Sequence, residues 1–127
     1  EIPINEEGVV QISSTQKIKS LKTNALKVFC RNNELEVLEA PNALSVGCNK
    51  NKIKSLYLDH AENVHCAENK LIALHAPKAT HVKCNLNQLT QLSLEKVVEL
   101  ECSGNELVRA LGTNRVARYE SLYDFRN

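Results

Sequence analysis

A cysteine occupies every eighteenth position over most of this chain, at Cys30, Cys48, Cys66, Cys84 and Cys102. An asparagine follows three residues after each cysteine, at Asn33, Asn51, Asn69, Asn87 and Asn105. An aliphatic residue follows two residues after each asparagine, at Leu35, Ile53, Leu71, Leu89 and Leu107. Three columns that keep step over five periods indicate one short unit repeated along the chain, which predicts a solenoid.

Each unit contains two stretches in which apolar and polar residues alternate. One stretch ends at the cysteine, as in the segment 46–48, and the other lies between the asparagines, as in 56–58. Alternation with a period of two is typical of a half-buried strand. Two strands of about three residues and two turns fill most of an 18-residue unit. Little room is left for a helix.

One unit cannot shield its own apolar side chains, so successive units must stack. Parallel strands of stacked units lie about 4.8 Å apart along the axis. The sequence therefore predicts a mainly β, right-handed solenoid with coils of about 18 residues. Short parallel strands are expected on both faces, with little or no helix outside the C-terminal cap.

The asparagine column has a physical reason in such a fold. A turn that enters the core carries backbone groups that water cannot reach. An asparagine amide offers both donors and acceptors, so it can satisfy these groups and link one coil to the next.

The length of 127 residues predicts a single domain, 1–127. It divides into an N-terminal cap, the repeats and a C-terminal cap, at 1–9, 10–111 and 112–127. Val10 and Ile12 lie one period before Val28 and Cys30, so a first coil begins there without its cysteine. After Leu107 the pattern ends. The tail is expected to be either a short amphipathic helix or a degenerate last coil that covers the open end of the core.

The unit resembles that of the leucine-rich repeat family. The family core, L-x-x-L-x-L-x-x-N/C-x-L, is matched in register by Ala43, Val46, Cys48, Asn51 and Ile53. The unit is shorter than the roughly 20–29 residues usual for the family. Cysteine also replaces the usual aliphatic residue at the second strand position.

The resemblance covers roughly 10–111 and is greatest to the short bacterial repeats of the family, whose prolines are echoed by Pro41 and Pro77. More specifically, the chain is similar to spirochaetal, treponemal leucine-rich repeat proteins. The family implies a binding scaffold that works through the face of the V-x-C strands, but it does not imply a particular ligand.

Composition argues against several classes of function. The net charge is +1 and no basic run is interleaved with aromatic residues, so nucleic-acid binding is not expected. No apolar stretch approaches the length that a membrane-spanning helix needs, so no membrane span is expected. Since the chain lacks methionine even at position 1, we expect an exported protein (bacterial surface, periplasm or secreted) whose signal is absent from this chain.

The cysteine column allows three interpretations. Stacked cysteines would place their Cα atoms within the disulfide range of about 4.4–6.8 Å, but their number is odd and their side chains should point the same way. A straight ladder does not converge as a tetrahedral zinc site requires. We therefore expect free cysteines packed as small hydrophobes. His65 and Cys66 should face opposite ways, and no catalytic residue, cofactor or metal is predicted.

Candidate binding residues lie on the outward side of the V-x-C strands. They are Phe29, Arg31, Asn49, His65, His81, Lys83, Glu99 and Glu101. Positive groups gather at the start of this strip and negative groups at its far end, with Phe29 and Arg31 as anchors. The alternative is a solvated surface on which His81 pairs with Glu99 and Lys83 with Glu101, each pair contributing about 0–1 kcal/mol. The outward residues of the opposite strands are interpreted as ordinary surface.

These observations predict a non-catalytic scaffold that docks a protein partner on the V-x-C face, in an interaction between host and bacterium. The alternative is a self-association module that forms a homodimer. It would pair through the open solenoid end or through the apolar tail residues Tyr119, Leu122, Tyr123 and Phe125.

Overall fold

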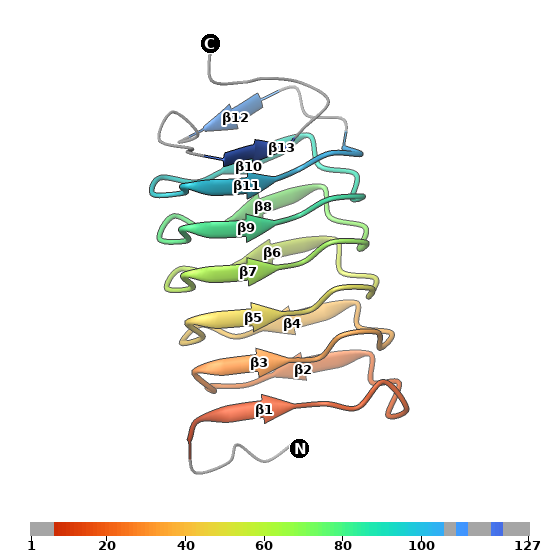
Figure 1. The fold of residues 1–127 in the computed structure, drawn as a ribbon. Helices are drawn as coiled ribbons and strands as arrows, with labels where there is room; N and C mark the ends of the chain where they lie inside the picture. The colour runs from red at the N-terminus through yellow and green to blue at the C-terminus, as the bar shows by residue number, and fades with distance from the viewer. Residues whose placement is uncertain (1–6, 106–108, 112–117, 121–127) are drawn as a thin grey trace.

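The chain winds into a parallel β-solenoid (Figure 1). The computed structural model describes residues 7–105, 109–111 and 118–120. No residue in these ranges is helical. The strands, of three residues each, are β1 Val9–Gln11, β2 Ser20–Lys22, β3 Lys27–Phe29, β4 Val37–Glu39, β5 Ser45–Gly47, β6 Ser55–Tyr57, β7 Asn63–His65, β8 Ala73–His75, β9 His81–Lys83, β10 Gln91–Ser93, β11 Glu99–Glu101, β12 Arg109–Leu111 and β13 Arg118–Glu120.

The strands form two opposed layers. The odd-numbered strands make one seven-stranded sheet in the order β1-β3-β5-β7-β9-β11-β13, here called the front sheet. The even-numbered strands lie behind it as a two-stranded sheet, β2-β4, and a four-stranded sheet, β12-β10-β8-β6. In Figure 1 the front strands run left to right and the chain returns behind them while it rises, so the solenoid is right-handed.

The register confirms the 18-residue coil. Val28, Val46 and Val64 are direct partners in neighbouring strands of the front sheet. The period changes by one residue at each end of the solenoid. Leu21 pairs with Leu38, which is one residue short of the period, and Leu100 pairs with Tyr119, which is one residue beyond it. Residues 118–120 thus form a strand of a degenerate coil, whereas the rest of the predicted C-terminal cap lies outside the described residues.

The core is a stack of matching side chains. The middle residue of β2 to β11 points inward and is buried, as the alternation predicts. The coil that starts at Val46 buries six apolar residues: Val46, Cys48, Ile53, Leu56, Leu58 and Ala61. Each fully buried large aliphatic contributes about 1.5–3 kcal/mol, so the stacked columns supply the main driving force for folding.

The asparagine column also enters the core, and each of its hydrogen-bonded side chains joins its own coil to the preceding one. The Asn87 Oδ1 accepts from the backbone N–H groups of Asn69 and Leu71, at 3.2 and 3.0 Å. Its Nδ2 donates to the carbonyls of Cys66 and Cys84, at 3.0 and 3.1 Å. This confirms that the column links one coil to the next.

A column of left-handed residues, which the sequence analysis did not identify, makes the asparagine turn possible. The residue before each asparagine has a positive φ, from 55° to 71°: Asn32, Lys50, Glu68, Leu86 and Gly104. Glycine adopts this conformation freely, but in other L-residues it costs about 1–2 kcal/mol. The cost is smallest at Gly104 and greatest at the bulky Leu86, and the buried asparagine bonds offset it.

The back of the solenoid is interrupted between β4 and β6. These two strands do not pair, although they are one period apart, as β6 and β8 are. Elsewhere in this layer the Leu58 N–H donates to the His75 carbonyl at 2.9 Å and the Ile72 N–H donates to the Lys54 carbonyl at 2.9 Å. Ala40 and Lys54 lie one period before Leu58 and Ile72. Among the described residues, their N–H groups donate no corresponding hydrogen bond to a backbone carbonyl of the neighbouring coil.

Amide hydrogen exchange should reveal this interruption. We expect the Ala40 and Lys54 amides to exchange at least about tenfold faster than those of Leu58 and Ile72, because the latter must first break a ladder hydrogen bond. Native-state exchange followed residue by residue by NMR gives the rates. Equal protection at the four amides would contradict the break.

Candidate partner-binding groove

A groove of about 640 Å³ crosses the outward side of the front sheet, from β1 to β7. Its lining residues come from four strands and the turns that follow them: Gln11, Ile12, Lys27, Phe29, Arg31, Ser45, Val46, Gly47, Asn49, Asn63 and His65. Its volume lies within the range of about 300–1,000 Å³ that is typical of ligand sites.

Gly47 creates the groove. Phe29, Gly47 and His65 are the last residues of β3, β5 and β7 and are register partners on the outward side of the front sheet, so a side chain is missing between two rings. A Cβ atom at Gly47 would lie 3.2 Å from the Phe29 Cδ1, closer than an ordinary van der Waals contact. One edge of the Phe29 ring therefore lies beside the glycine, and 40% of Phe29 stays exposed.

The groove is cationic at one end. Lys27 and Arg31 are exposed on either side of Phe29, and no carboxylate is among the lining residues. His65 lies at the other end, where partial burial, with a smaller contribution from Lys83, lowers its pKa below the usual value. The neutral form of His65 is therefore favoured, and the positive charge of the groove comes from Lys27 and Arg31.

A second hollow, of about 250 Å³, adjoins the groove at Asn63 and His65. It lies over β7, β9 and β11. Lys83 Nζ lies 3.5 Å from Glu101 Oε2, and His81 Nε2 lies 4.0 Å from Glu99 Oε2, a contact that is an ion pair only when the imidazole is protonated. The paired-charge interpretation thus describes this half of the face. Such exposed pairs contribute only about 0–1 kcal/mol.

Two asparagines of this face differ in their bonding. The Asn49 Oδ1 accepts from the Ala67 N–H at 2.9 Å, so part of this predicted binding residue serves the stacking of coils. The Asn85 Oδ1 is buried and has no hydrogen-bond partner. Replacing Asn85 with alanine should therefore cost little stability, because no hydrogen bond to this oxygen is lost.

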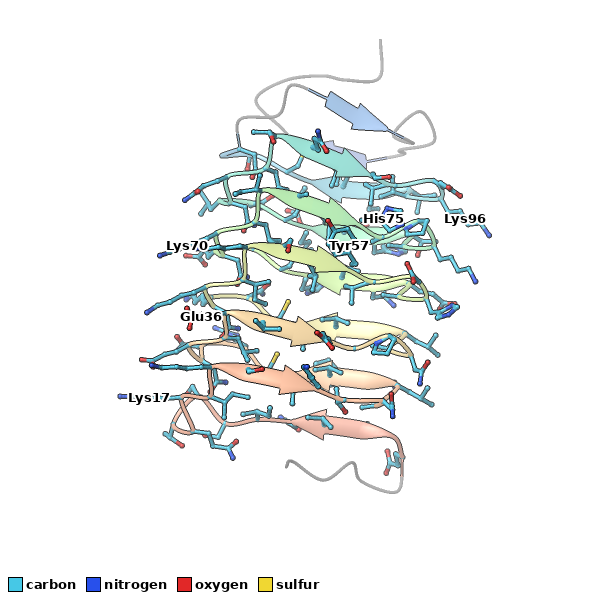
Figure 2. The ribbon with its side chains drawn as sticks, turned by 180° about the vertical axis from the view of Figure 1, so that it is seen from behind. Lys17, Glu36, Tyr57, Lys70, His75 and Lys96 are labelled. Carbon is cyan, nitrogen blue, oxygen red and sulfur yellow. The ribbon has the colours of Figure 1, made fainter. Side chains whose placement is uncertain are left out.

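The opposite face carries a third hollow, of about 350 Å³, beside the interruption between β4 and β6. Tyr57 lines this hollow and lies next to His75 (Figure 2), with ring centroids 6.1 Å apart. The lining carboxylates include Glu39 and Asp59. Glu39 Oε2 lies 3.9 Å from Lys22 Nζ, and Asp59 Oδ1 lies 3.9 Å from His75 Nε2. This hollow was not anticipated from the sequence.

The five cysteines are free and buried, as expected for packing residues. Burial raises the pKa of Cys30 to about 12 and raises the pKa values of Cys48, Cys66 and Cys84 well above 9.0. Within the described part of the chain, no three His, Cys, Asp or Glu side chains are arranged to hold a metal ion. The same residues contain no helix able to cross a membrane.

The structure places all eight predicted binding residues along the two adjoining hollows of the front face. Phe29, Arg31, Asn49 and His65 line the groove, and His65 also borders the second hollow with His81, Lys83, Glu99 and Glu101. Sequence reasoning did not select Lys27 or Gly47. The available signals were a cation one period before Ser45 and the missing side chain at Gly47, between Phe29 and His65.

The predicted self-association residues are only partly placed. Tyr119 lies in β13, where its backbone pairs with that of Leu100. Leu122, Tyr123 and Phe125 lie outside the described residues.

Comparison with known proteins gives no relative, because no family model, curated protein or solved structure matches the chain.

Proposed function

We propose that this chain is a non-catalytic leucine-rich repeat protein of the short bacterial type that docks a protein partner on the outward side of the front sheet. The proposal rests on the groove in which one edge of the exposed Phe29 ring lies beside Gly47, with Lys27 and Arg31 among the lining residues. Aromatic and arginine side chains are the residues that most often dominate binding energy at protein interfaces.

The extent of the face favours a macromolecule over a small ligand. The groove and the second hollow follow one another from β1 to β11 along a continuous sheet. Six of its strands span roughly 24 Å at about 4.8 Å per interval. A partner that lies along the stack can engage the groove and the paired charges together.

The family assignment is supported by the unit itself. Its aliphatic, cysteine and asparagine columns match the family core in phase, and the asparagines form buried ladders between coils. Members of the family bind through the face that carries the groove in this chain. The assignment therefore agrees with the surface on which we place the partner.

Phe29→Ala combined with Arg31→Ala is expected to weaken the partner at least about tenfold with little change in Tm, because both side chains are exposed and lie outside the core. A partner is first captured on the immobilised chain and purified. Its affinity for each variant is then measured by calorimetry, and the Tm of each variant by circular dichroism.

Lys22→Ala combined with Tyr57→Ala is the matched control, since it removes one cation and one exposed aromatic from the opposite face. It should leave binding unchanged. Binding that is lost only together with unfolding, or lost equally in the control, would remove the front face as the docking site.

A further inference from the structure

We propose that the occupant of the groove is an acidic, extended segment of the protein partner, with one apolar side chain seated over Gly47 beside Phe29 and carboxylates facing Lys27 and Arg31. This inference rests on the proposed docking function and names the chemistry of the partner. It follows from the charge, the length and the apolar floor of the groove.

The charge of the groove selects an anion. Lys27 and Arg31 contribute two positive charges, and none of the lining residues is a carboxylate. The carboxylates of the adjoining hollow, Glu99 and Glu101, already face His81 and Lys83. Arginine binds carboxylates through two parallel hydrogen bonds, which lysine cannot form, so Arg31 also sets their orientation.

The dimensions of the groove fit a short extended chain. It crosses four strands, β1 to β7, so its length is roughly 14 Å at about 4.8 Å per interval. An extended chain advances about 3.3 Å per residue, so roughly four residues fill this length. The strands beneath already pair with one another, so the segment is recognised through its side chains and adds no strand to the sheet.

The floor of the groove offers one apolar seat. The glycine leaves the backbone of β5 open to the ligand, and the ring of Phe29 forms one wall. An aromatic or large aliphatic side chain placed there removes apolar surface of both partners from water. A segment with acidic residues around one such side chain matches the whole groove.

Selection from a random heptapeptide display library on the immobilised chain tests this inference. We expect the enriched sequences to carry Asp and Glu around one large apolar residue. A synthetic peptide of the enriched sequence should bind at least about tenfold more weakly to the variant with Lys27→Gln and Arg31→Gln, and its affinity should fall with added salt. Gly47→Val should also weaken it, because the new side chain fills the apolar seat.

The control variant carries Lys52→Gln and Lys70→Gln, which lower the net charge equally on exposed turns away from the groove. It should bind the peptide like the unmodified chain. Equal weakening by the two double variants would show a general charge effect and overturn the inference.

The remaining outcomes separate the inference from the proposed function. Enriched neutral or basic peptides that lose affinity on Phe29→Ala and Arg31→Ala would overturn the acidic occupant and leave the docking face in place. Enriched peptides whose affinity is unchanged by Phe29→Ala and by Arg31→Ala, or a library that shows no enrichment, would count against the acidic occupant and against the proposed docking face. Concentration-dependent sedimentation abolished by Arg31→Glu would assign the groove to a second copy of the chain and overturn the inference.

Discussion

Replacing Asn87 with alanine is expected to lower the free energy of unfolding by about 3 kcal/mol. The carbonyls of Cys66 and Cys84 keep a second asparagine donor, from the coil on either side, so they stay bonded. The buried N–H groups of Asn69 and Leu71 lose the Asn87 Oδ1 and have no other acceptor within the described part of the chain. Each unsatisfied buried group costs about 1–3 kcal/mol, and two such groups account for the expected loss.

Asn85→Ala is the matched control, since it changes the same residue type in the same turn. The Asn85 Oδ1 is without a partner, so this substitution should alter stability by less than about 0.5 kcal/mol. Urea denaturation followed by far-UV circular dichroism measures both variants. Similar losses in the two would mean that the buried ladder does not stabilise the solenoid.

The native protein is expected to protect all five thiols from a disulfide reagent that modifies the unfolded chain readily. The thiolate is the reactive form, and each unit by which the pKa rises lowers its fraction tenfold. A rise in the pKa of Cys30 from 9.0 to about 12 therefore slows its reaction about a thousandfold near pH 8. Burial of the sulfur atoms slows it further, since none of the five residues is more than 1% exposed.

Thiol counting before and after denaturation measures this protection, and Lys83→Cys supplies an exposed thiol on the same sheet as a control for reagent activity. A native cysteine that reacts as fast as this control would contradict the buried column.

The raised pKa values of the buried thiols also make the stability of the protein depend on pH. Because the unfolded thiols ionise first, the thiols leave the free energy of unfolding unchanged below about pH 9 and lower it as the pH rises above that value.

The candidate site was predictable in part. Strand alternation alone assigned Phe29, His65 and Lys83 to the outward side of one sheet, and the structure places them there. Alternation could not show that one edge of the Phe29 ring lies beside Gly47, because that depends on how a side chain of the neighbouring coil is oriented. It also could not show that the Asn49 amide bonds to the backbone of the next coil.

The irregular features of the fold were less accessible. The failure of β4 to pair with β6 has no counterpart in the residue columns, since Leu38 and Leu56 follow the repeat in register. The column of left-handed residues could not be recognised from the sequence, because only Asn32 and Gly104 are residue types that favour this conformation. Lys50, Glu68 and Leu86 adopt it because the buried asparagine that follows each of them stabilises the turn. Tertiary hydrogen bonds there override local preference.

The 18-residue period by itself determined the coil, the inward columns and the asparagine ladder. These depend on which residue types recur at a fixed spacing, and any stack of such units must bury the same columns. Only the tertiary structure decided where the outward face is hollow, which charges are paired and where the back layer is interrupted. Each of these depends on contacts between side chains or strand edges of adjacent coils, and these contacts differ from one coil to the next although the repeat does not.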